Sequence, residues 1–267
     1  MVATTAKLTF TIDTGAKPVS GSDEPGGRIT HHKGRQAIVD VPIDNGRDLG
    51  ETNLDREGFR LVASPSAVGD FHDDETLARI YYPEVEALIA TQTGANRVIV
   101  FDHTLRHGDE AAQAQRHLRE PVRIVHNDYT DWSGPQRVRD LFPDEADRML
   151  AGRMAIIQAW RPTAGPVLRD PLAICDARSL APSDLIAAER RHADRVGEIY
   201  HVASNPAQRW YYFPEMTPDE VMIFKCYDSL LDGRARFTAH GSFDDPGTLP
   251  NAPPRESIEI RTFAFFD

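Results

Sequence analysis

The sequence predicts a mainly β protein with flanking helices, in which the strands form a barrel or a sandwich. Two observations favour this class. Short runs of β-branched and aromatic residues, separated by Pro, Gly and Asp, fill the last third of the chain. Earlier in the chain, segments with helical spacing alternate with similar runs. Because 267 residues can bury a substantial core, we expect one domain over residues 1–267.

Two strands are expected near the N-terminus. They are KLTFTID at residues 7–13 and QAIVDVPI at residues 36–43. Gly, Ser, Pro and charged residues dominate the stretch from Gly15 to Gly34, which predicts a long mobile loop between the strands. We therefore expect residues 1–57 to supply a sheet edge and a lid.

Three segments have the spacing of helices. The first is Asp73–Thr93, where Pro83 suits a first turn and Gly94 suits the residue after the last turn. The second is Gln136–Ala151, which Pro143 interrupts, and the third is the charged stretch Ser183–Arg195. The last two are expected to pack on the outside of the sheet.

The core strands begin at Arg97. RVIVFDH and VRIVHNDYT are β-branched runs, and the polar segment Thr104–Glu120 between them predicts a loop or a helical excursion. Six further runs are expected to be strands, at residues 155–160, 198–203, 209–213, 221–228, 235–240 and 257–266. Strands this frequent are typical of a closed or two-layered β structure.

Charge and cysteine content exclude several classes of protein. Forty-one acidic residues against 30 basic ones give a net charge of −11, without a Lys/Arg block that could bind nucleic acid or an anionic membrane surface. No apolar run approaches the roughly 20 residues that a membrane helix needs. Cys175 and Cys226 are too few for a disulfide framework, and the N-terminus lacks the pattern of a signal peptide. We therefore expect a cytoplasmic protein.

A metal-binding group is predicted from three residues. His126 and Asp128 are two positions apart in a β-like run, so their side chains point to the same face of a strand. His240 ends another such run far along the chain and is the best candidate for a third ligand. Two His and one carboxylate leave coordination positions open, which is the arrangement of non-haem Fe(II) oxygenases.

Arg255 and Ser257 are candidates for binding a carboxylate, because a guanidinium and a hydroxyl on one strand face suit such a group. Strict alternation, however, extends this face to Glu259 and Arg261. The same face is therefore equally compatible with a solvated, salt-bridged exterior, with the isoleucines between these residues inside. A bulge between Ser257 and Glu259 would reconcile the two interpretations.

Further polar residues have two interpretations each. On a helix, His103 and His107 would have the spacing of a zinc pair, but the preceding apolar run favours a strand. His103 and Arg106, with the neighbouring Asp102, line a substrate pocket or form a buried network. Arg161 reaches a substrate carboxylate or pairs with a nearby acid. Lys225 and Tyr227 are two positions apart and therefore lie on the same face of a strand, and this face is directed either toward the cavity or outward.

Five motifs carry a resemblance to a known family. They are HNDYT, QAWRP, RWYYFPEMTPDEVMIFKCYDS, RFTAHGSFDDP and PRESIEIRTFAFF, and they extend from about Gly58 to the C-terminus. In this order they resemble the CmcJ/NvfI family of oxygenases. The departures are mild: Gln208 stands where relatives often have a basic residue, and Gln158 stands where Asn is usual.

The resemblance implies a double-stranded β-helix (cupin-like jelly roll) core over residues 58–267, with Fe(II) and 2-oxoglutarate as cofactors. Carried over residue by residue, it implies iron binding and catalysis by His126, Asp128 and His240. It also implies that Arg255 and Ser257 bind 2-oxoglutarate.

The function expected from this resemblance is a dioxygenase that uses O2 to oxidise a small molecule in specialised-metabolite biosynthesis. The oxidation is a hydroxylation, a desaturation or an oxidative cyclisation. Two alternatives stay open: a zinc-dependent hydrolase or lyase with the same ligands, and a non-catalytic partner subunit of a biosynthetic enzyme. A homodimer is compatible with all three.

Overall fold

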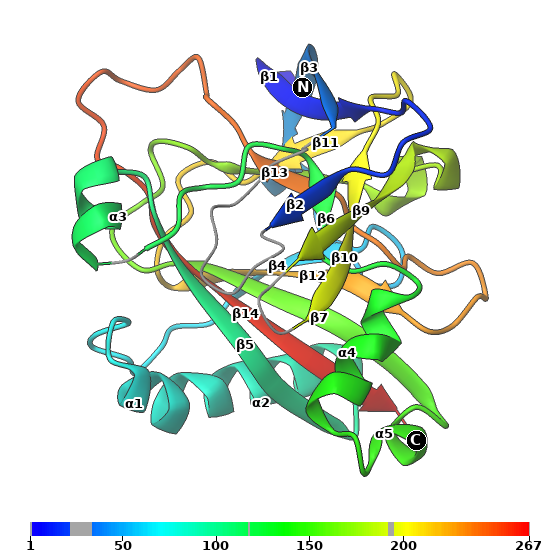
Figure 1. Ribbon diagram of the computed structural model, residues 1–267. Coiled ribbons are helices and arrows are strands. Elements are labelled where there is room, and N and C mark those ends of the chain that lie inside the picture. The colour runs from blue at the N-terminus through cyan, green and yellow to red at the C-terminus, as the bar shows by residue number, and fades with distance from the viewer. Residues whose placement is uncertain (1, 22–33, 117, 192–194, 267) are drawn as a thin grey trace.

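The protein is mostly β in the computed structural model, which describes residues 2–21, 34–116, 118–191 and 195–266 (Figure 1). These residues contain one nine-stranded and one five-stranded sheet. The prediction of a mainly β protein with flanking helices is therefore confirmed. Within the described ranges, none of the helices has the length and apolar character needed to span a membrane.

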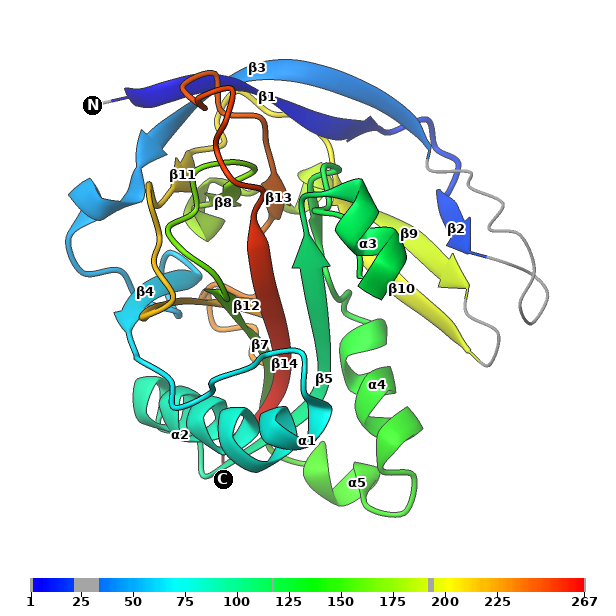
Figure 2. The same ribbon diagram turned by 90° about the vertical axis from the view of Figure 1, so that its left-hand side faces the viewer.

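The five-stranded sheet is antiparallel and has β14 near its centre. Its order is β4 (Phe59–Ala63), β12 (Glu220–Asp228), β7 (Arg153–Pro162), β14 (Glu256–Phe266) and β5 (Arg97–His107). Figure 2 shows α1 (Asp74–Thr76) and α2 (Tyr82–Thr93) crossing one end of this sheet. One face of the sheet packs against side chains of α2, and the other packs against the nine-stranded sheet. The three inner strands β12, β7 and β14 are therefore buried along almost their whole length.

The nine-stranded sheet is mixed and curls over the other sheet. Its order is β1 (Val2–Ile12), β3 (Arg35–Asn45), β11 (Trp210–Tyr212), β8 (Leu172–Cys175), β13 (His240–Ser242), β6 (His126–Asn127), β10 (Val196–Val202), β9 (Leu185–Arg191) and β2 (Val19–Gly21). The amide of Val125, just before β6, donates to the carbonyl of Thr9 in β1. The outermost strand β1 is thus tied back to the middle of its own sheet.

The helix predicted over Asp73–Thr93 is confirmed, and Pro83 and Gly94 act as expected. The Asp73 side chain accepts a hydrogen bond from the amide of Glu75, and Pro83 lies in the first turn of α2. Gly94 ends the helix with φ 72°, a left-handed conformation that costs glycine little. A π-helical turn over Leu77–Tyr81 joins α1 to α2.

The remaining helices agree with the prediction in part. The segment interrupted at Pro143 forms two helices, α4 (Ser133–Leu141) and α5 (Ala146–Met149), and the excursion after β5 contains α3 (Glu110–Arg116). The helix predicted over Ser183–Arg195 is wrong. A short 3-10 turn there leads into β9, which pairs with β10 on one side and with β2 on the other. Tertiary pairing has overridden the helical spacing, and residues 192–194 lie outside the described residues.

Two other expectations need correction. Val19–Gly21 forms the strand β2 inside the segment predicted as a loop, while residues 22–33 lie outside the described part of the chain, so the predicted mobility is untested. The strand predicted over residues 235–240 begins only at His240. Before it, the amide of Thr238 is bonded by the side chain of Asn127 instead of by a neighbouring strand.

Candidate metal and co-substrate site

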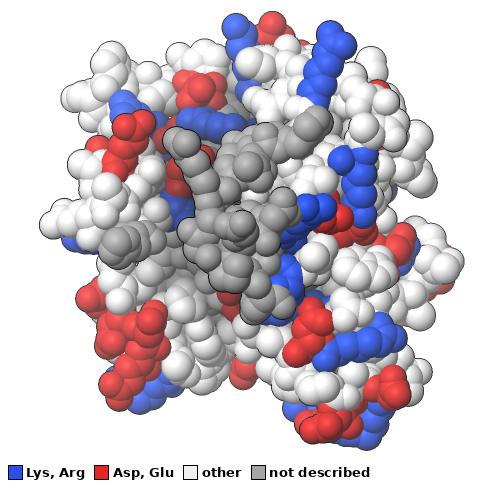
Figure 3. Space-filling model, in the orientation of Figure 1, with Lys and Arg blue, Asp and Glu red and all other residues white. Residues whose placement is uncertain are grey.

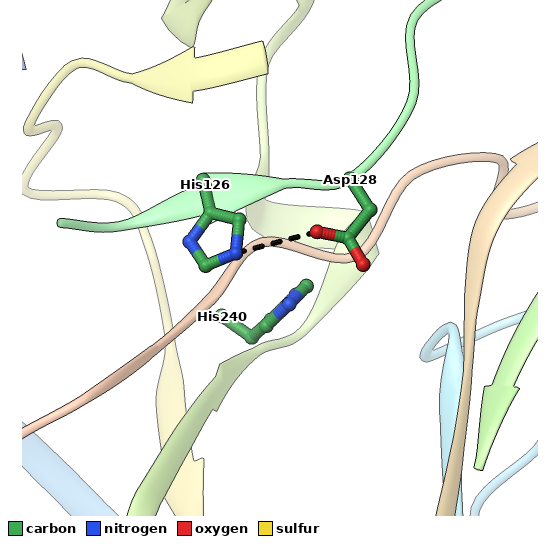
Figure 4. Close-up of side chains that lie close together, drawn as sticks. All are labelled: His126, Asp128 and His240. Carbon is green, nitrogen blue, oxygen red and sulfur yellow. Dashed lines mark ion pairs between the residues drawn. The ribbon is translucent and has the colours of Figure 1, made fainter. Parts of the chain in front are cut away.

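Three potential metal ligands meet where β6 and β13 pair. His126 lies in β6, Asp128 follows that strand directly, and His240 begins β13, opposite His126 in the register. One ligand atom from each residue lies within 4.8 Å of the other two. Figure 4 shows both rings and the carboxylate directed toward a common centre. The structure thus brings together the three residues that the sequence singled out.

Backbone contacts fix the orientation of both imidazoles. Nδ1 of His126 lies 2.8 Å from the carbonyl oxygen of Ile124, and Nδ1 of His240 lies 2.9 Å from that of Thr238. Because a carbonyl only accepts, each Nδ1 must carry the hydrogen. Each Nε2 then keeps its lone pair, and hydrogen bonds of this kind orient metal-binding histidines in general.

The charges of His240 and Asp128 also suit a cation. Burial lowers the pKa of His240 to about 4, so its ring is neutral at physiological pH. Burial alone would raise the pKa of Asp128, but Arg261, the largest opposing cause, and the neighbouring His126 and His240 together outweigh it and hold that pKa well below the usual value. A metal ion requires this combination of neutral imidazole and ionised carboxylate.

Arg261, in β14, holds the carboxylate of Asp128. Its Nε donates to Oδ2 of Asp128 at 2.8 Å, and its two terminal nitrogens donate to Asp102 and Glu259, each at 3.0 Å. Glu259 is in turn paired with Arg106. Because Oδ2 is occupied by Arg261, Oδ1 is the oxygen that faces Nε2 of His126, at 3.4 Å.

The alternative of a solvated exterior for this face of β14 is wrong. Ser257 is 1% exposed, Glu259 7% and Arg261 9%, while Ile258 and Ile260 pack in the apolar cluster beside α2. The predicted alternation of side chains along β14 is correct, but the sheet is covered on both sides, so both faces of the strand are interior. The register irregularity falls between Arg261 and Thr262, beyond the place where a bulge was expected.

Arg255 and Ser257 are buried beside β7. The guanidinium of Arg255 lies 5.3 Å from the centre of the Trp160 ring and donates through Nη1 to the carbonyl of Asp170 at 2.6 Å. Within the described residues, Nε of Arg255, Oγ of Ser257, Nε1 of Trp160 and Oε1 of Gln158 are buried without a hydrogen-bond partner. Buried unsatisfied polar atoms are rare, so several in one region suit the binding of a polar ligand.

A cavity of about 1370 Å³ opens above the metal-ligand group. His126, Asp128 and Arg261 lie on its wall, together with residues of β5, α4, β9 and β10. Arg106 borders the cavity, but its guanidinium is bonded to Glu259 and to the carbonyl of Glu120. His103 borders it as well, and its Nδ1 lies 2.6 Å from the hydroxyl of Tyr82.

The structure does not bring Arg161 into this group. Its side chain is 1% exposed, and it donates to the hydroxyl of Tyr81 and to the carbonyls of Ser64 and Pro218. It does not border the cavity and has no nitrogen left without an acceptor. Arg161 thus connects its own strand, β7, to Tyr81 in the helical segment and to the backbone at Ser64 and Pro218.

Three other sequence candidates also lie outside the metal site. The helical zinc pair is wrong, because His103 and His107 both lie in the strand β5. Lys225 is 1% exposed and pairs with Asp55 and Asp228. Tyr227 packs in the apolar core.

Sequence reasoning missed the role of Arg261. Alternation along the strand places Arg261 on the same face as Ser257, but the sequence does not show whether that face lies inside or outside the protein. Its contact with Asp128 joins residues that are far apart in the chain.

Comparisons with known proteins identify relatives over most of the chain. A family model described as "Oxidoreductase/YMDC permease-like domain" matches residues 8–265. The hydroxylase/desaturase efuI of Hormonema carpetanum is 36% identical, over 82% of this chain and 80% of the relative. The Fe(II)/2-oxoglutarate-dependent dioxygenase nvfI of Aspergillus novofumigatus is 33% identical, over 80% and 78%.

A solved structure is similar over nearly the whole chain. The iron and alpha-ketoglutarate-dependent endoperoxidase NvfI superposes with a TM-score of 0.85 at 27% identity, covering 98% of this chain and 97% of that one. This likeness confirms the predicted double-stranded β-helix, or jelly-roll, core. The resemblance predicted from the five motifs is confirmed too, and the family match includes most of residues 1–57, which the motifs left out.

Proposed function

We propose a catalytic role for each part of this site from one premise, that the chain belongs to the oxidoreductase family of the iron- and 2-oxoglutarate-dependent oxygenases reported above. The chain is an oxidoreductase that uses iron(II), 2-oxoglutarate and O2 to oxidise a small molecule. The observation that carries the residue assignments is the convergence of two correctly oriented imidazoles and one ionised carboxylate.

His126, Asp128 and His240 bind the iron. Three ligands of this kind leave positions open for a co-substrate and for O2. When bound, the iron supplies the oxidising chemistry, in which 2-oxoglutarate is decarboxylated to succinate. The chain contributes the orientation: the carbonyls of Ile124 and Thr238 hold the two rings.

Arg255 and Ser257 bind the distal carboxylate of 2-oxoglutarate. Their unpartnered Nε and Oγ atoms are donors with the right chemistry, and the ring of Trp160 supports the guanidinium. Burial lowers the pKa of Arg255 to about 10, which still leaves the guanidinium charged at neutral pH. Because Arg255 is only 3% exposed, a carboxylate bound here is shielded from water and its hydrogen bonds gain strength.

Arg261 is a positioning residue for the metal. It occupies Oδ2 of Asp128 and thereby directs Oδ1 toward the histidines. Arg106 and Arg261 together outweigh the burial of Glu259 and hold its pKa at about 2. The ionised Glu259 accepts a hydrogen bond from Arg261 and so orients its guanidinium. The small-molecule substrate enters the adjoining cavity, whose walls determine whether hydroxylation, desaturation or cyclisation follows.

Three further statements belong to the same proposal. Residues 1–267 form one oxygenase domain, which is supported by the pairing of β3 with β11 in a single sheet and by a family match over residues 8–265. The protein is cytoplasmic, in keeping with two buried, free cysteines. A homodimer stays a prediction that light scattering after size-exclusion chromatography checks.

A crystal soaked anaerobically with Fe(II) and 2-oxoglutarate tests the residue assignments. We expect iron between His126, Asp128 and His240, and the distal carboxylate of 2-oxoglutarate on Arg255 and Ser257. Metal analysis and succinate release from the same protein, with His240→Ala and Arg255→Gln as variants, distinguish an oxygenase from a zinc hydrolase. Iron bound without His240, or 2-oxoglutarate bound to a different arginine, would contradict the assignments.

A further inference from the structure

We propose that Asn127 is a positioning residue of the metal site, which holds the segment carrying His240 against the segment carrying His126 and Asp128. This inference rests on the proposed function and adds a residue to it. On the face that Figure 3 shows, basic and acidic side chains of the described residues are mixed, so surface charge there indicates no particular partner. The buried side-chain amide of Asn127, by contrast, is bonded to three different segments.

Three hydrogen bonds fix the side-chain amide of Asn127. Nδ2 donates to the carbonyl of Tyr129 at 2.7 Å and to the carbonyl of Cys226 at 2.8 Å. Oδ1 accepts from the amide of Thr238 at 3.1 Å. Because carbonyls only accept and a backbone N–H only donates, these partners allow a single orientation of the amide group. Asn127 is 0% exposed, so water does not compete for these bonds.

Two of the three partners are backbone groups outside the regular strand pairing. Cys226 lies at the register irregularity of β12 and is left without a paired residue in β7. Thr238 comes before β13, which begins at His240. A buried backbone group without a partner is costly. At both positions Asn127 therefore supplies the hydrogen bond that a regular sheet would provide.

Thr238 connects Asn127 to the metal ligand His240. Its amide is bonded by Asn127, and its carbonyl lies 2.9 Å from Nδ1 of His240. The ring of His240 also packs against Phe224, with 4.6 Å between the ring centres, and Phe224 lies two residues before Cys226 in β12. The Asn127 amide thus holds two backbone segments that contact the His240 ring.

One hydrogen bond of Asn127 replaces a step of the β ladder. The register pairs β6 with β13 at one position among the described residues, His126 with His240. Continued antiparallel pairing would place Thr238 opposite Asp128, but the side chain of Asn127 bonds the Thr238 amide instead. Regular pairing therefore stops at the metal ligands, and the Asn127 amide keeps the two segments together beyond that point.

The metal affinity of Asn127→Ala, compared with that of Gln208→Ala, tests the proposal. Gln208 is the matched control, because it is another buried amide, and its Nε2 donates to Asp184 and to the carbonyl of Ala203. Mn(II) affinity is measured by competition between the metal-free protein and a chromophoric chelator. We expect about tenfold weaker Mn(II) binding in Asn127→Ala and wild-type affinity in Gln208→Ala, although both variants lose buried hydrogen bonds and stability.

The ring tautomer of His240 is a second readout, which a loss of stability alone does not change. In the metal-free protein, the carbonyl of Thr238 requires the hydrogen on Nδ1 of this ring. We expect nitrogen chemical shifts, measured by NMR, to show this tautomer in the wild type and in Gln208→Ala, and a mixture with the Nε2–H tautomer in Asn127→Ala. Asn127→Ser, which leaves a hydroxyl beside the same partners, replaces the alanine variant if that variant does not fold.

Four outcomes would overturn the proposal. The Asn127 variant binds Mn(II) as tightly as the wild type, or it keeps the wild-type tautomer of His240. Alternatively, Gln208→Ala loses as much affinity, which indicates a general loosening of the fold. Finally, both Asn127 variants fail to fold while Gln208→Ala folds, which makes Asn127 a residue of folding and not of positioning.

His240→Ala separates this proposal from the previous one. Unchanged Mn(II) affinity in His240→Ala contradicts the metal assignment itself. Weaker binding in His240→Ala together with wild-type affinity in Asn127→Ala contradicts only the role of Asn127.

Discussion

Replacing Arg261 by Lys should weaken metal binding although the charge is kept. The planar guanidinium donates to Asp128, Asp102 and Glu259 in three directions, and a compact ammonium on a different stem cannot reproduce that geometry. Asp128 then loses the bond to Oδ2 that directs Oδ1 toward His126. Loss of such an outer partner costs roughly 10- to 100-fold in metal affinity, or about 1.4 to 2.7 kcal/mol.

The assay is competition for Mn(II) or Fe(II) between the metal-free protein and a chromophoric chelator, under anaerobic conditions. Arg161→Lys is the matched control, because Arg161 is also a buried arginine, lies on the neighbouring strand and has three acceptors of its own. Both variants should lower the free energy of unfolding, since both lose buried hydrogen bonds. Only Arg261→Lys should lower metal affinity.

Two results would refute this reasoning. If Arg261→Lys binds metal as tightly as the wild-type protein, Asp128 does not need the guanidinium for its orientation. If Arg161→Lys loses as much affinity as Arg261→Lys, the effect is a general loosening of the sheet. Comparison of Arg261→Gln with Arg261→Lys isolates the charge, because both variants lose the orientation of Asp128 but only the glutamine also removes a cation that repels the metal.

Three further predictions concern neighbouring groups. Ser257→Ala should raise KM for 2-oxoglutarate about tenfold with little change in kcat, measured by succinate release; an unchanged KM would exclude the hydroxyl from the co-substrate site. Burial lowers the pKa of His201 to about 4, so between pH 6.5 and 4 the unfolded state binds a proton that the native state does not. The free energy of unfolding, measured by chemical denaturation, should therefore fall by up to about 3 kcal/mol as the pH is lowered through this window. His201→Gln should reduce this dependence of the free energy on pH. Lys225→Met should destabilise the protein by about 3 kcal/mol without changing metal affinity, because the fully buried Asp228 then keeps Arg153 alone as a counter-ion among the described residues. An unchanged melting temperature would contradict this.

Local signals in the sequence predicted those parts of the structure that depend on neighbouring residues. The helix ending at Gly94 followed from its helical spacing, a proline in a first turn and a glycine after the last turn. The common orientation of His126 and Asp128 followed from their spacing alone, because a strand repeats every two residues. The helix predicted over Ser183–Arg195 failed because β9 gains its stability from pairing with β10 and β2, which no local pattern encodes.

The sequence by itself determined the types of residue in the site, the parity of Ser257 with Arg261 and, through the five motifs, the family. Only the tertiary structure decided that both faces of β14 are interior, that Arg261 holds Asp128 and that Arg161 is committed elsewhere. The physical reason is that alternation along a strand assigns side chains to two faces without saying what covers each face. That depends on which distant strands pair and on how the two sheets curl over one another, and the pairing of His240 with His126 is itself such a long-range contact.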